Sequence, residues 1–294
     1  MTGANGFVGS CLRRILPFNP LSLEGGPAID LRKPSEVRAA VRSQAPDVVV
    51  HLAAQSFVPR SFLDPLETYE TNFLGTLNLL DALKQTSFSG VFLFVGSGDM
   101  YGLVPPEHIP IKEDRALHPR NPYAVSKVAA EALCFQWSAT ERFKIVMARP
   151  FNHIGPGQSE RFAVSGFAKQ IIEIKKGRRE PTLSVGDIHV TRDFTDVRDI
   201  VRAYQLLIEH GENGESYNVC SGIETPLREI VNRLMDIAGV QASIKQDSSL
   251  FRSTEQRRQV GCFCKLNRTT GWSPSIALDR SLREILSYWE KELE

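Results

Sequence analysis

Hydrophobic and polar positions form two kinds of segment along the first half of the chain. Short apolar runs, of the length of buried parallel strands, occupy Val48 to Ala54, Gly90 to Val95 and Lys144 to Ala148. Between them, apolar residues recur every three or four positions, which predicts amphipathic helices. These helices cover about residues 7–16, 34–44, 65–84 and 122–141. Strands that alternate with helices in this way predict a parallel sheet with helices on both faces.

The alternation changes after about residue 155. Further helices are predicted at 162–176, 198–210, 227–238 and 278–293, with short strands near 183–185, 217–220 and 242–245. We therefore predict an α/β fold: a Rossmann-like, doubly wound parallel sheet followed by a smaller mixed α/β lobe. The predicted domains are residues 1–155, with segments of about 186–222 returning to the first domain, and 156–294.

Three glycines, Gly3, Gly6 and Gly9, open the sequence at the start of the first predicted helix. This spacing allows a tight turn and the close approach of a pyrophosphate to a helix N-terminus, although a plain glycine turn is the alternative. A dinucleotide-binding fold also needs a strand before the glycines, and only Met1 and Thr2 are available. We expect this first strand to be largely missing, and we hypothesise that the intact protein begins upstream of Met1. A further short strand is predicted at Leu21 to Glu24.

Charge and composition narrow the classes of partner. The formal net charge of +1, from 35 basic and 34 acidic residues, gives no reason to expect nucleic acid or an anionic membrane as a partner. The apolar runs are too short to span a bilayer, and the N-terminus lacks the features of a signal peptide. We therefore expect a cytoplasmic location.

The five cysteines are odd in number and scattered, which predicts free thiols rather than disulfides. Cys262 and Cys264 are one residue apart, but no second pair or nearby histidine completes a zinc site. We interpret these two cysteines as structural and predict no metal site. His51, within an apolar run, is interpreted as a packed or backbone-bonded core histidine rather than a ligand.

Tyr123 and Lys127 are the main candidates for chemistry. Four residues apart on a predicted helix, they lie on one face. A phenol has an ordinary pKa of about 10, and a cation held beside it favours the phenolate and makes it a usable acid–base group. A surface helix with both side chains in solvent is the alternative. Ser97, just after the strand that ends at Val95, belongs at the sheet edge where ligands bind.

The glycine triplet, Ser97, the Tyr123-x-x-x-Lys127 pair and the C-terminal lobe together resemble the extended short-chain dehydrogenase/reductase family. Members of this family bind a nicotinamide dinucleotide and act on nucleotide sugars. Within the family the chain is similar to reductases that convert GDP-4-dehydro-6-deoxy-D-mannose to GDP-D-rhamnose. The segments that carry the resemblance are 51–54, 72–76, 97–102, 149–158, 185–187, 192–196, 217–222 and 269–274.

The resemblance implies a catalytic trio of Ser97, Tyr123 and Lys127. Tyr123 would give a proton to the sugar oxygen as a hydride reaches the C4 carbonyl carbon, and Ser97 would hydrogen-bond the same oxygen. Lys127 would hold the nicotinamide ribose and lower the pKa of Tyr123. Two donors aimed at an oxygen that gains negative charge stabilise the transition state.

The resemblance also implies binding residues for each ligand. For the cofactor they are Gly3, Asn5, Gly6, Phe7, Val8, Asp30, Leu31, Leu52, Ala53 and Ala54, with Tyr123 and Lys127. For the GDP-sugar they are Ser97, Asp99, Asn152, Val185, Arg192, Arg252 and Glu255. The alternative for Arg192 is an ion pair with Asp193 or Asp196, and for Arg252 a solvated loop charge. Asn121 and His153 are further candidates that would otherwise cap the helix and orient the loop.

Several choices stay open. The cofactor is NADP or NAD, and this choice stays open because Glu24, the acidic residue near the second strand, cannot be aligned securely. NADP is slightly preferred. GDP-mannose 4,6-dehydratase, or another nucleotide-sugar epimerase or reductase, is the nearest alternative activity. Dehydration commonly needs a glutamate where this chain has Asp99, which favours reduction. A non-catalytic dinucleotide-binding regulatory protein is the alternative of another class. The resemblance implies a homodimer through helices 65–84 and 122–141, whose apolar stripes would equally cover the sheet.

Overall fold

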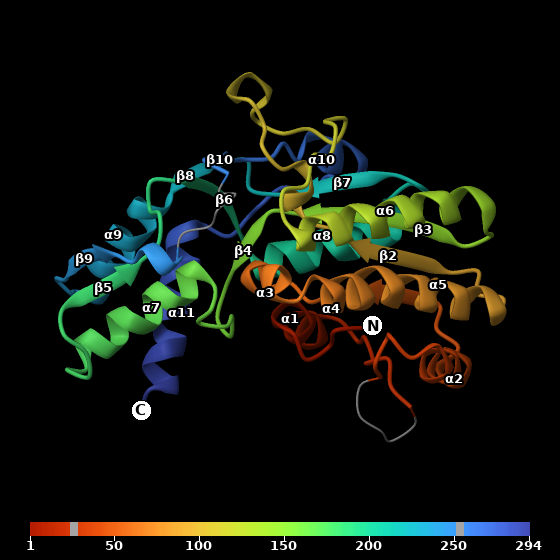
Figure 1. The fold of residues 1–294 in the computed structure, drawn as a ribbon, viewed down its shortest axis with the longest axis horizontal. Helices are drawn as coiled ribbons and strands as arrows, with labels where there is room; N and C mark the ends of the chain where they lie inside the picture. Colours follow the sequence, from red (N-terminus) through yellow and green to blue (C-terminus); the bar gives the residue numbers. More distant parts are fainter. Residues whose placement is uncertain (24–28, 251–255) are drawn as a thin grey trace.

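A computed structural model describes residues 1–23, 29–250 and 256–294. Figure 1 shows a larger body built on a parallel sheet and a smaller lobe that carries the C-terminus. Within the described part of the chain, no helix is long and apolar enough to cross a membrane.

The main sheet consists of four parallel strands in the order β1-β2-β3-β7. Their bounds are β1 Val48–His51, β2 Val91–Val95, β3 Lys144–Pro150 and β7 Ser216–Val219. The first three coincide with the apolar runs, and their central residues are fully buried, as expected of strands covered on both faces. The predicted parallel sheet is confirmed.

Helices cover both faces of this sheet. On one face α1 (Phe7–Ile15) packs against α8 (Val197–His210), and on the other lie α2 (Pro34–Gln44), α5 (Gly75–Gln85) and α6 (Pro122–Thr140). Two separate hydrophobic cores result, one on each face. The doubly wound, Rossmann-like arrangement predicted from the sequence is therefore confirmed.

The helix predicted at 65–84 is interrupted. It consists of α4 (Pro65–Tyr69), a π-helical turn η1 (Glu70–Leu74) and α5, after a short helix α3 (Val58–Leu63) that was not predicted. The wide turn contains Asn72, whose buried side chain accepts from Gln55 N and donates to Gln55 O and Ser126 Oγ. These bonds tie the interrupted helix to α6.

The smaller lobe contains two further sheets and its own core. In one sheet β6 (Thr191–Asp196) pairs with β4 (Asn152–Ile154), β10 (Arg258–Gln259) and β8 (Glu224–Pro226), and in the other β5 (Thr182–Val185) pairs with β9 (Ser243–Gln246). The helices α7 (Ala163–Lys175), α9 (Leu227–Ala238) and α11 (Leu278–Glu292) enclose the lobe core. In contrast, α10 (Cys264–Thr270) packs on α8 and β7 of the main body.

Thr2 lies beside β1, where a strand before the glycines would pair. Its N–H donates to Val50 O at 3.0 Å, and it forms one parallel bridge with His51. Leu21 N donates to Met1 O at 2.7 Å on the other side. The strand predicted at Leu21 to Glu24 is not formed over residues 21–23, where Ser22 is a single bridge residue, and Glu24 lies outside the described residues.

His51 is a core histidine, as predicted. It is 1% exposed, with Nδ1 2.8 Å from Thr2 Oγ1 and Nε2 2.9 Å from Thr76 Oγ1. The Thr76 hydroxyl donates to Asn72 O, so it accepts from His51 Nε2–H, and Nδ1 accepts from Thr2. This network suits a neutral ring, and burial lowers the pKa of His51 to about 3.

This shift predicts a dependence of stability on pH. The unfolded chain binds a proton at His51 below its ordinary pKa of about 6.5, whereas the folded chain binds it near 3. The contribution of His51 to the free energy of unfolding is therefore fully present above about pH 6.5 and is lost progressively between pH 6.5 and 3. From pH 7 to 5.5 His51 should remove about 1 kcal/mol of unfolding free energy. Urea unfolding at both pH values, compared with His51→Asn, tests this; equal pH slopes in the two proteins would contradict it.

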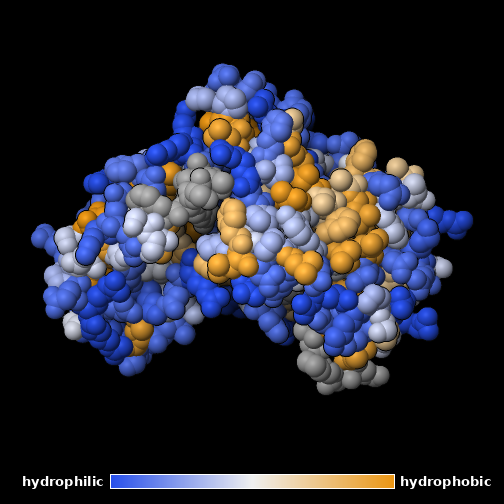
Figure 2. All heavy atoms as spheres, in the orientation of Figure 1, coloured by the Kyte–Doolittle hydropathy of each residue, from blue (hydrophilic) through white to orange (hydrophobic). Residues whose placement is uncertain are grey.

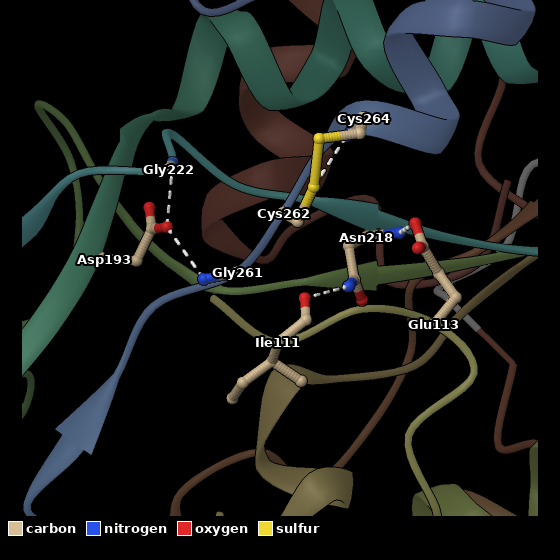
Figure 3. The surroundings of a disulfide bond; sticks show 8 residues. All are labelled: Ile111, Glu113, Asp193, Asn218, Gly222, Gly261, Cys262 and Cys264. Atoms are coloured by element: carbon tan, nitrogen blue, oxygen red, sulfur yellow. Dashed lines mark hydrogen bonds between the residues drawn. A yellow bond between two sulfur atoms is a disulfide. The ribbon is translucent and has the colours of Figure 1, made fainter. Parts of the chain in front are cut away.

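The cysteine prediction is wrong for one pair. Cys262 and Cys264 form a disulfide, with Cα atoms 5.4 Å apart (Figure 3). Cys262 N donates to Ile111 O, while Cys264 begins α10, so the turn at Phe263 brings the two Cα atoms within the separation that a disulfide requires. The one-residue separation of Cys262 and Cys264 along the sequence does not reveal this turn. Cys11, Cys134 and Cys220 are buried free thiols, and burial raises the pKa of each.

Candidate active site

The glycine turn packs directly on the carboxyl end of β1. Gly3 has φ +67°, and a Cβ there would lie 2.7 Å from Ala53 N. A Cβ on Gly9 would lie 2.2 Å from Gly3 O. Glycine is therefore required at both positions, and the turn brings the predicted cofactor residues Gly3 to Val8 together with Leu52 and Ala53.

The start of α1 suits an anionic group. Its N-terminus has no side-chain cap, and its first turn contains no acidic residue, so backbone N–H groups and the positive end of the helix dipole stay available. The glycine turn and this helix end together fit the pyrophosphate of a dinucleotide. Of the other predicted cofactor residues, Asp30 accepts from Arg32, and Leu31 is buried with its carbonyl bonded to Asn78 Nδ2.

Gly9→Ala should disrupt this turn. The added methyl meets backbone rather than a flexible side chain, so the turn must shift, and we expect affinity for NADPH to fall at least tenfold. Titration of NADPH fluorescence measures the effect. Ser10→Ala, on the exposed side of the same helix, is the control and should bind as the parent does. Unchanged affinity in Gly9→Ala would contradict the assignment of the turn.

The predicted catalytic trio lies together at the ends of β2 and α6. The Ser97 side chain lies close enough to the Tyr123 phenol to lower its pKa. Lys127 Nζ donates to Val95 O at 2.7 Å, two residues before Ser97, and lies 5.1 Å from the centre of the Phe94 ring. Tyr123 and Lys127 are 9% and 3% exposed, so the alternative of two solvent-facing side chains is wrong.

The electrostatics of Tyr123 differ from the prediction. Burial and the charge of Asp99 raise the pKa of the phenol above its ordinary value, and the Ser97 side chain offsets this only in part. Lys127 is not among the groups that lower this pKa, and its ammonium donates to Val95 O. Burial lowers the pKa of Lys127 to about 8, which leaves it mainly charged at neutral pH.

Two minor candidates have structural contacts. Asn121 caps α6, since its Oδ1 accepts from Ala124 N at 2.7 Å, and Pro122 occupies the first helical turn. His153 Nδ1 lies 3.0 Å from Phe151 O, and its ring lies parallel to Phe7 at 6.0 Å. These contacts match the capping and loop-orienting alternatives, and they place the β3–β4 loop against the glycine turn.

The predicted substrate residues lie mainly in the smaller lobe. Asn152 is exposed on β4, and Val185 ends β5 beside Gly186, which approaches Leu250. Arg192 is buried on β6 and donates to Thr191 O and Gln256 O. Arg252 and Glu255 lie outside the described residues.

The aspartates proposed as ion-pair partners of Arg192 have other contacts. Asp193 accepts from the N–H groups of Ser221, Gly222 and Gly261 (Figure 3 shows the two glycines). Asp196 pairs with Arg198 instead.

A buried ion pair behind the trio was not predicted. Arg149 Nε donates to Glu131 at 3.0 Å, and Nη1 donates to Tyr101 Oη at 2.7 Å. Tyr101 Oη donates to Asn218, which also bonds Ile111 and Glu113 (Figure 3). This network joins α6 to the turn after Ser97. A signal was available, because Glu131 extends the Tyr123 and Lys127 stripe by one more helical turn.

Comparison with known proteins decides the family. The family model described as GDP-mannose 4,6 dehydratase matches residues 27–285. The chain belongs to this family. A curated relative, the GDP-6-deoxy-D-mannose reductase of Pseudomonas aeruginosa, is 49% identical over 100% of this chain and 97% of its own length.

Solved structures agree with this assignment. The structure of RMD from Pseudomonas aeruginosa complexed with NADPH has a TM-score of 0.92 and 48% identity, covering 99% of this chain and 97% of that one. The UDP-glucose 4-epimerase of Thermus thermophilus, in complex with NAD, has a TM-score of 0.85 and 29% identity, covering 98% and 97%. This member of the GDP-mannose 4,6 dehydratase family is an extended short-chain dehydrogenase/reductase and an NAD(P)-dependent oxidoreductase.

Proposed function

We propose that the protein reduces the C4 ketone of GDP-4-dehydro-6-deoxy-D-mannose to GDP-D-rhamnose with NADPH or NADH. The observation that carries the proposal is the grouping of the buried Tyr123 and Lys127 with Ser97 at the sheet edge that also holds the glycine turn. The 49% identity to a GDP-6-deoxy-D-mannose reductase supports the choice of substrate.

Each residue of the trio has a role in this reaction. A reduced nicotinamide, when bound, would supply the hydride that the carbonyl carbon takes up. Tyr123 donates its proton to the oxygen, because a phenol is protonated at neutral pH. Ser97 hydrogen-bonds the same oxygen, and the charged Lys127 holds the ribose hydroxyls. Solvent then returns a proton to Tyr123.

Recognition of the GDP-sugar is assigned to Asp99, Asn152, Val185 and Arg192, with Arg252 and Glu255 beyond the described residues. A guanidinium suits a diphosphate because its planar donors bond two oxygens at once. For the cofactor we propose a slight preference for NADP, since the relative from Pseudomonas aeruginosa was solved with NADPH, although the Thermus relative carries NAD. The ratio of kcat/KM with NADPH and NADH measures this preference.

A direct assay tests the proposed activity. Purified protein with NADPH should consume the cofactor when GDP-4-dehydro-6-deoxy-D-mannose is added. The same protein with GDP-mannose and oxidised cofactor should form no 4-keto-6-deoxy product, because Asp99 is one methylene shorter than the glutamate that dehydration commonly uses. Formation of that product would favour the dehydratase, and no turnover on any nucleotide sugar would favour a non-catalytic binding protein.

We further propose a cytoplasmic homodimer. Exposed apolar side chains gather on α3, α4 and α6, which pack side by side: Phe62, Leu63, Leu66, Val125 and Phe135. Figure 2 shows the corresponding hydrophobic area over these helices. Leu63 is 80% exposed and Leu66 65%, which is costly for a monomer in water but is typical of a helix-to-helix interface.

Negative charges introduced into this hydrophobic area should dissociate the dimer. Leu66→Glu combined with Phe135→Glu is expected to halve the mass measured by light scattering after size-exclusion chromatography, because burying carboxylates at the interface is unfavourable. Ile15→Glu, at another exposed apolar position on α1, is the control and should leave the mass unchanged. An unchanged mass in the double variant would contradict this interface.

A further inference from the structure

Asp193 joins three segments of the chain at the junction of the smaller lobe and the main body. It lies on β6 and is 0% exposed. Its Oδ1 accepts from Ser221 N at 2.7 Å and from Ser221 Oγ at 2.6 Å. Its Oδ2 accepts from Gly222 N at 2.9 Å and from Gly261 N at 3.2 Å, and Figure 3 shows these two glycines beside the carboxylate.

The bonded segments come from both bodies. Ser221 and Gly222 follow β7, a strand of the main sheet whose carboxyl end lies at the same edge as the catalytic trio. Gly261 follows β10 of the smaller lobe. A Cβ on Gly261 would lie 2.7 Å from the ring of Phe151, the residue before Asn152. The carboxylate therefore fixes the smaller lobe where its strands meet the main body.

Arg192, a predicted substrate residue, lies directly before Asp193 on β6, with its side chain on the other face of the strand. In the strand register Arg192 is opposite Gln259 of β10 on one side and opposite β8 on the other. The bonds of Asp193 reach the segment just before β8 and the segment just after β10. Gln259 Nε2 also donates to Asp99 Oδ1 at 3.2 Å, which connects β10 to the turn after β2. Both strands that flank Arg192 are thus held by one carboxylate.

The junction requires a carboxylate at Asp193. Each of its oxygens accepts two hydrogen bonds, and at least one donor on each oxygen is a backbone N–H. Asparagine has nearly the same shape, but its amide nitrogen donates and cannot accept. In either orientation of the amide, Asp193→Asn turns an NH₂ group towards a backbone N–H. The substitution therefore breaks bonds at the junction with little change in side-chain size.

We propose that Asp193 is a positioning residue that sets the smaller lobe against the main body, and with it the position of the nucleotide-sugar residues relative to the trio. The inference rests on the proposed function, because it takes Arg192 as a residue that holds the diphosphate of the GDP-sugar. Loss of the carboxylate should weaken the binding of that substrate. The cofactor site, built from the glycine turn and β1 of the main body, should remain intact.

Binding and kinetics of Asp193→Asn test the proposal together. The KM for GDP-4-dehydro-6-deoxy-D-mannose and the dissociation constant of GDP should both rise about tenfold, because the diphosphate residues lose their fixed position. The value of kcat should stay within about threefold, and the dissociation constant of NADPH within about twofold, of the parent values. Ser221→Ala removes one bond to Asp193 and should raise KM by a smaller factor. Calorimetric titration gives both dissociation constants.

Asp199 provides a matched control for a purely structural role. It is 1% exposed and accepts from Ser275 N, Ser275 Oγ and Ile276 N, so its surroundings resemble those of Asp193. The bonds of its carboxylate join α8 to the segment before α11. Asp199→Asn should therefore lower the free energy of unfolding, as Asp193→Asn does, but should leave the KM for the GDP-sugar and the affinity for GDP unchanged.

Hydrogen exchange gives a readout that needs no ligand. In Asp193→Asn the amides of residues 221–222 and 261 should exchange faster than in the parent, while those of β1, β2 and β3 keep their rates. Unchanged KM and GDP affinity in Asp193→Asn, an equal rise in the NADPH dissociation constant, or the same KM rise in Asp199→Asn would overturn the proposal. A parent protein that binds NADPH but no GDP would instead reject the proposed function, and hydrogen exchange would still decide whether Asp193 holds the junction.

Discussion

Tyr123→Phe is expected to lower kcat for ketone reduction by about 10² to 10⁴-fold while substrate and cofactor still bind. The change removes only the hydroxyl beside Ser97, and the ring keeps its buried position. The loss arises because the developing oxyanion has no positioned proton donor, whereas Ser97 and Lys127 remain. Stopped-flow oxidation of NADPH gives kcat, and ligand titration gives the dissociation constants.

Tyr101→Phe is the matched control. Tyr101 is also a fully buried phenol at the same sheet edge, but its hydroxyl bonds Asn218 and accepts from Arg149. Tyr101→Phe should lower the free energy of unfolding by roughly 1 to 3 kcal/mol, because its buried partners lose a hydrogen bond. The substitution should reduce kcat far less than Tyr123→Phe does. If the two variants lose the same fraction of kcat, Tyr123 is not the proton donor.

Arg149→Ala should destabilise the fold by about 3 to 5 kcal/mol. Arg149 and Glu131 are 6% and 6% exposed, and removal of the guanidinium leaves a buried carboxylate unpaired. The hydrogen bonds to Tyr101 and Glu113 O are lost at the same time. Urea unfolding measures the change.

Two comparisons make this result specific. Lys84→Ala, which removes an ion pair whose lysine is 55% exposed, should change the unfolding free energy by about 1 kcal/mol or less. Arg149→Met combined with Glu131→Gln removes both charges and should recover much of the stability lost in Arg149→Ala. A loss below about 1 kcal/mol in Arg149→Ala would show that the pair contributes little.

Local signals predicted the body of the molecule well. β1, β2 and β3 were found as apolar runs because strands buried on both faces need continuous hydrophobic side chains. The helices α2 and α6 carry prolines in their first turns and were placed closely. In contrast, β4, β6 and β10 are short or carry polar residues whose partners come from distant segments, so no periodic pattern marks them.

The site was predictable where function fixes residue type and spacing, and not where it depends on long-range contacts. Tyr123 and Lys127 could be paired by helical spacing, and Ser97 by its position after β2. The Gln259–Asp99 contact joins residues 160 apart and leaves no local trace. The disulfide of Cys262 and Cys264 depends on the turn into α10, and the pKa of Tyr123 depends on burial and on Asp99, neither of which spacing along the chain reveals.

Transfer of an isotope from the cofactor tests the central claim most directly. Purified protein is incubated with GDP-4-dehydro-6-deoxy-D-mannose and NADPH that carries deuterium at the transferable position, and the product is analysed by NMR. The account predicts one deuterium bonded to C4 of the sugar, with the C4 configuration of GDP-D-rhamnose. Tyr123→Phe should form this labelled product far more slowly. Deuterium at another carbon, the opposite C4 configuration, or unlabelled product would contradict it.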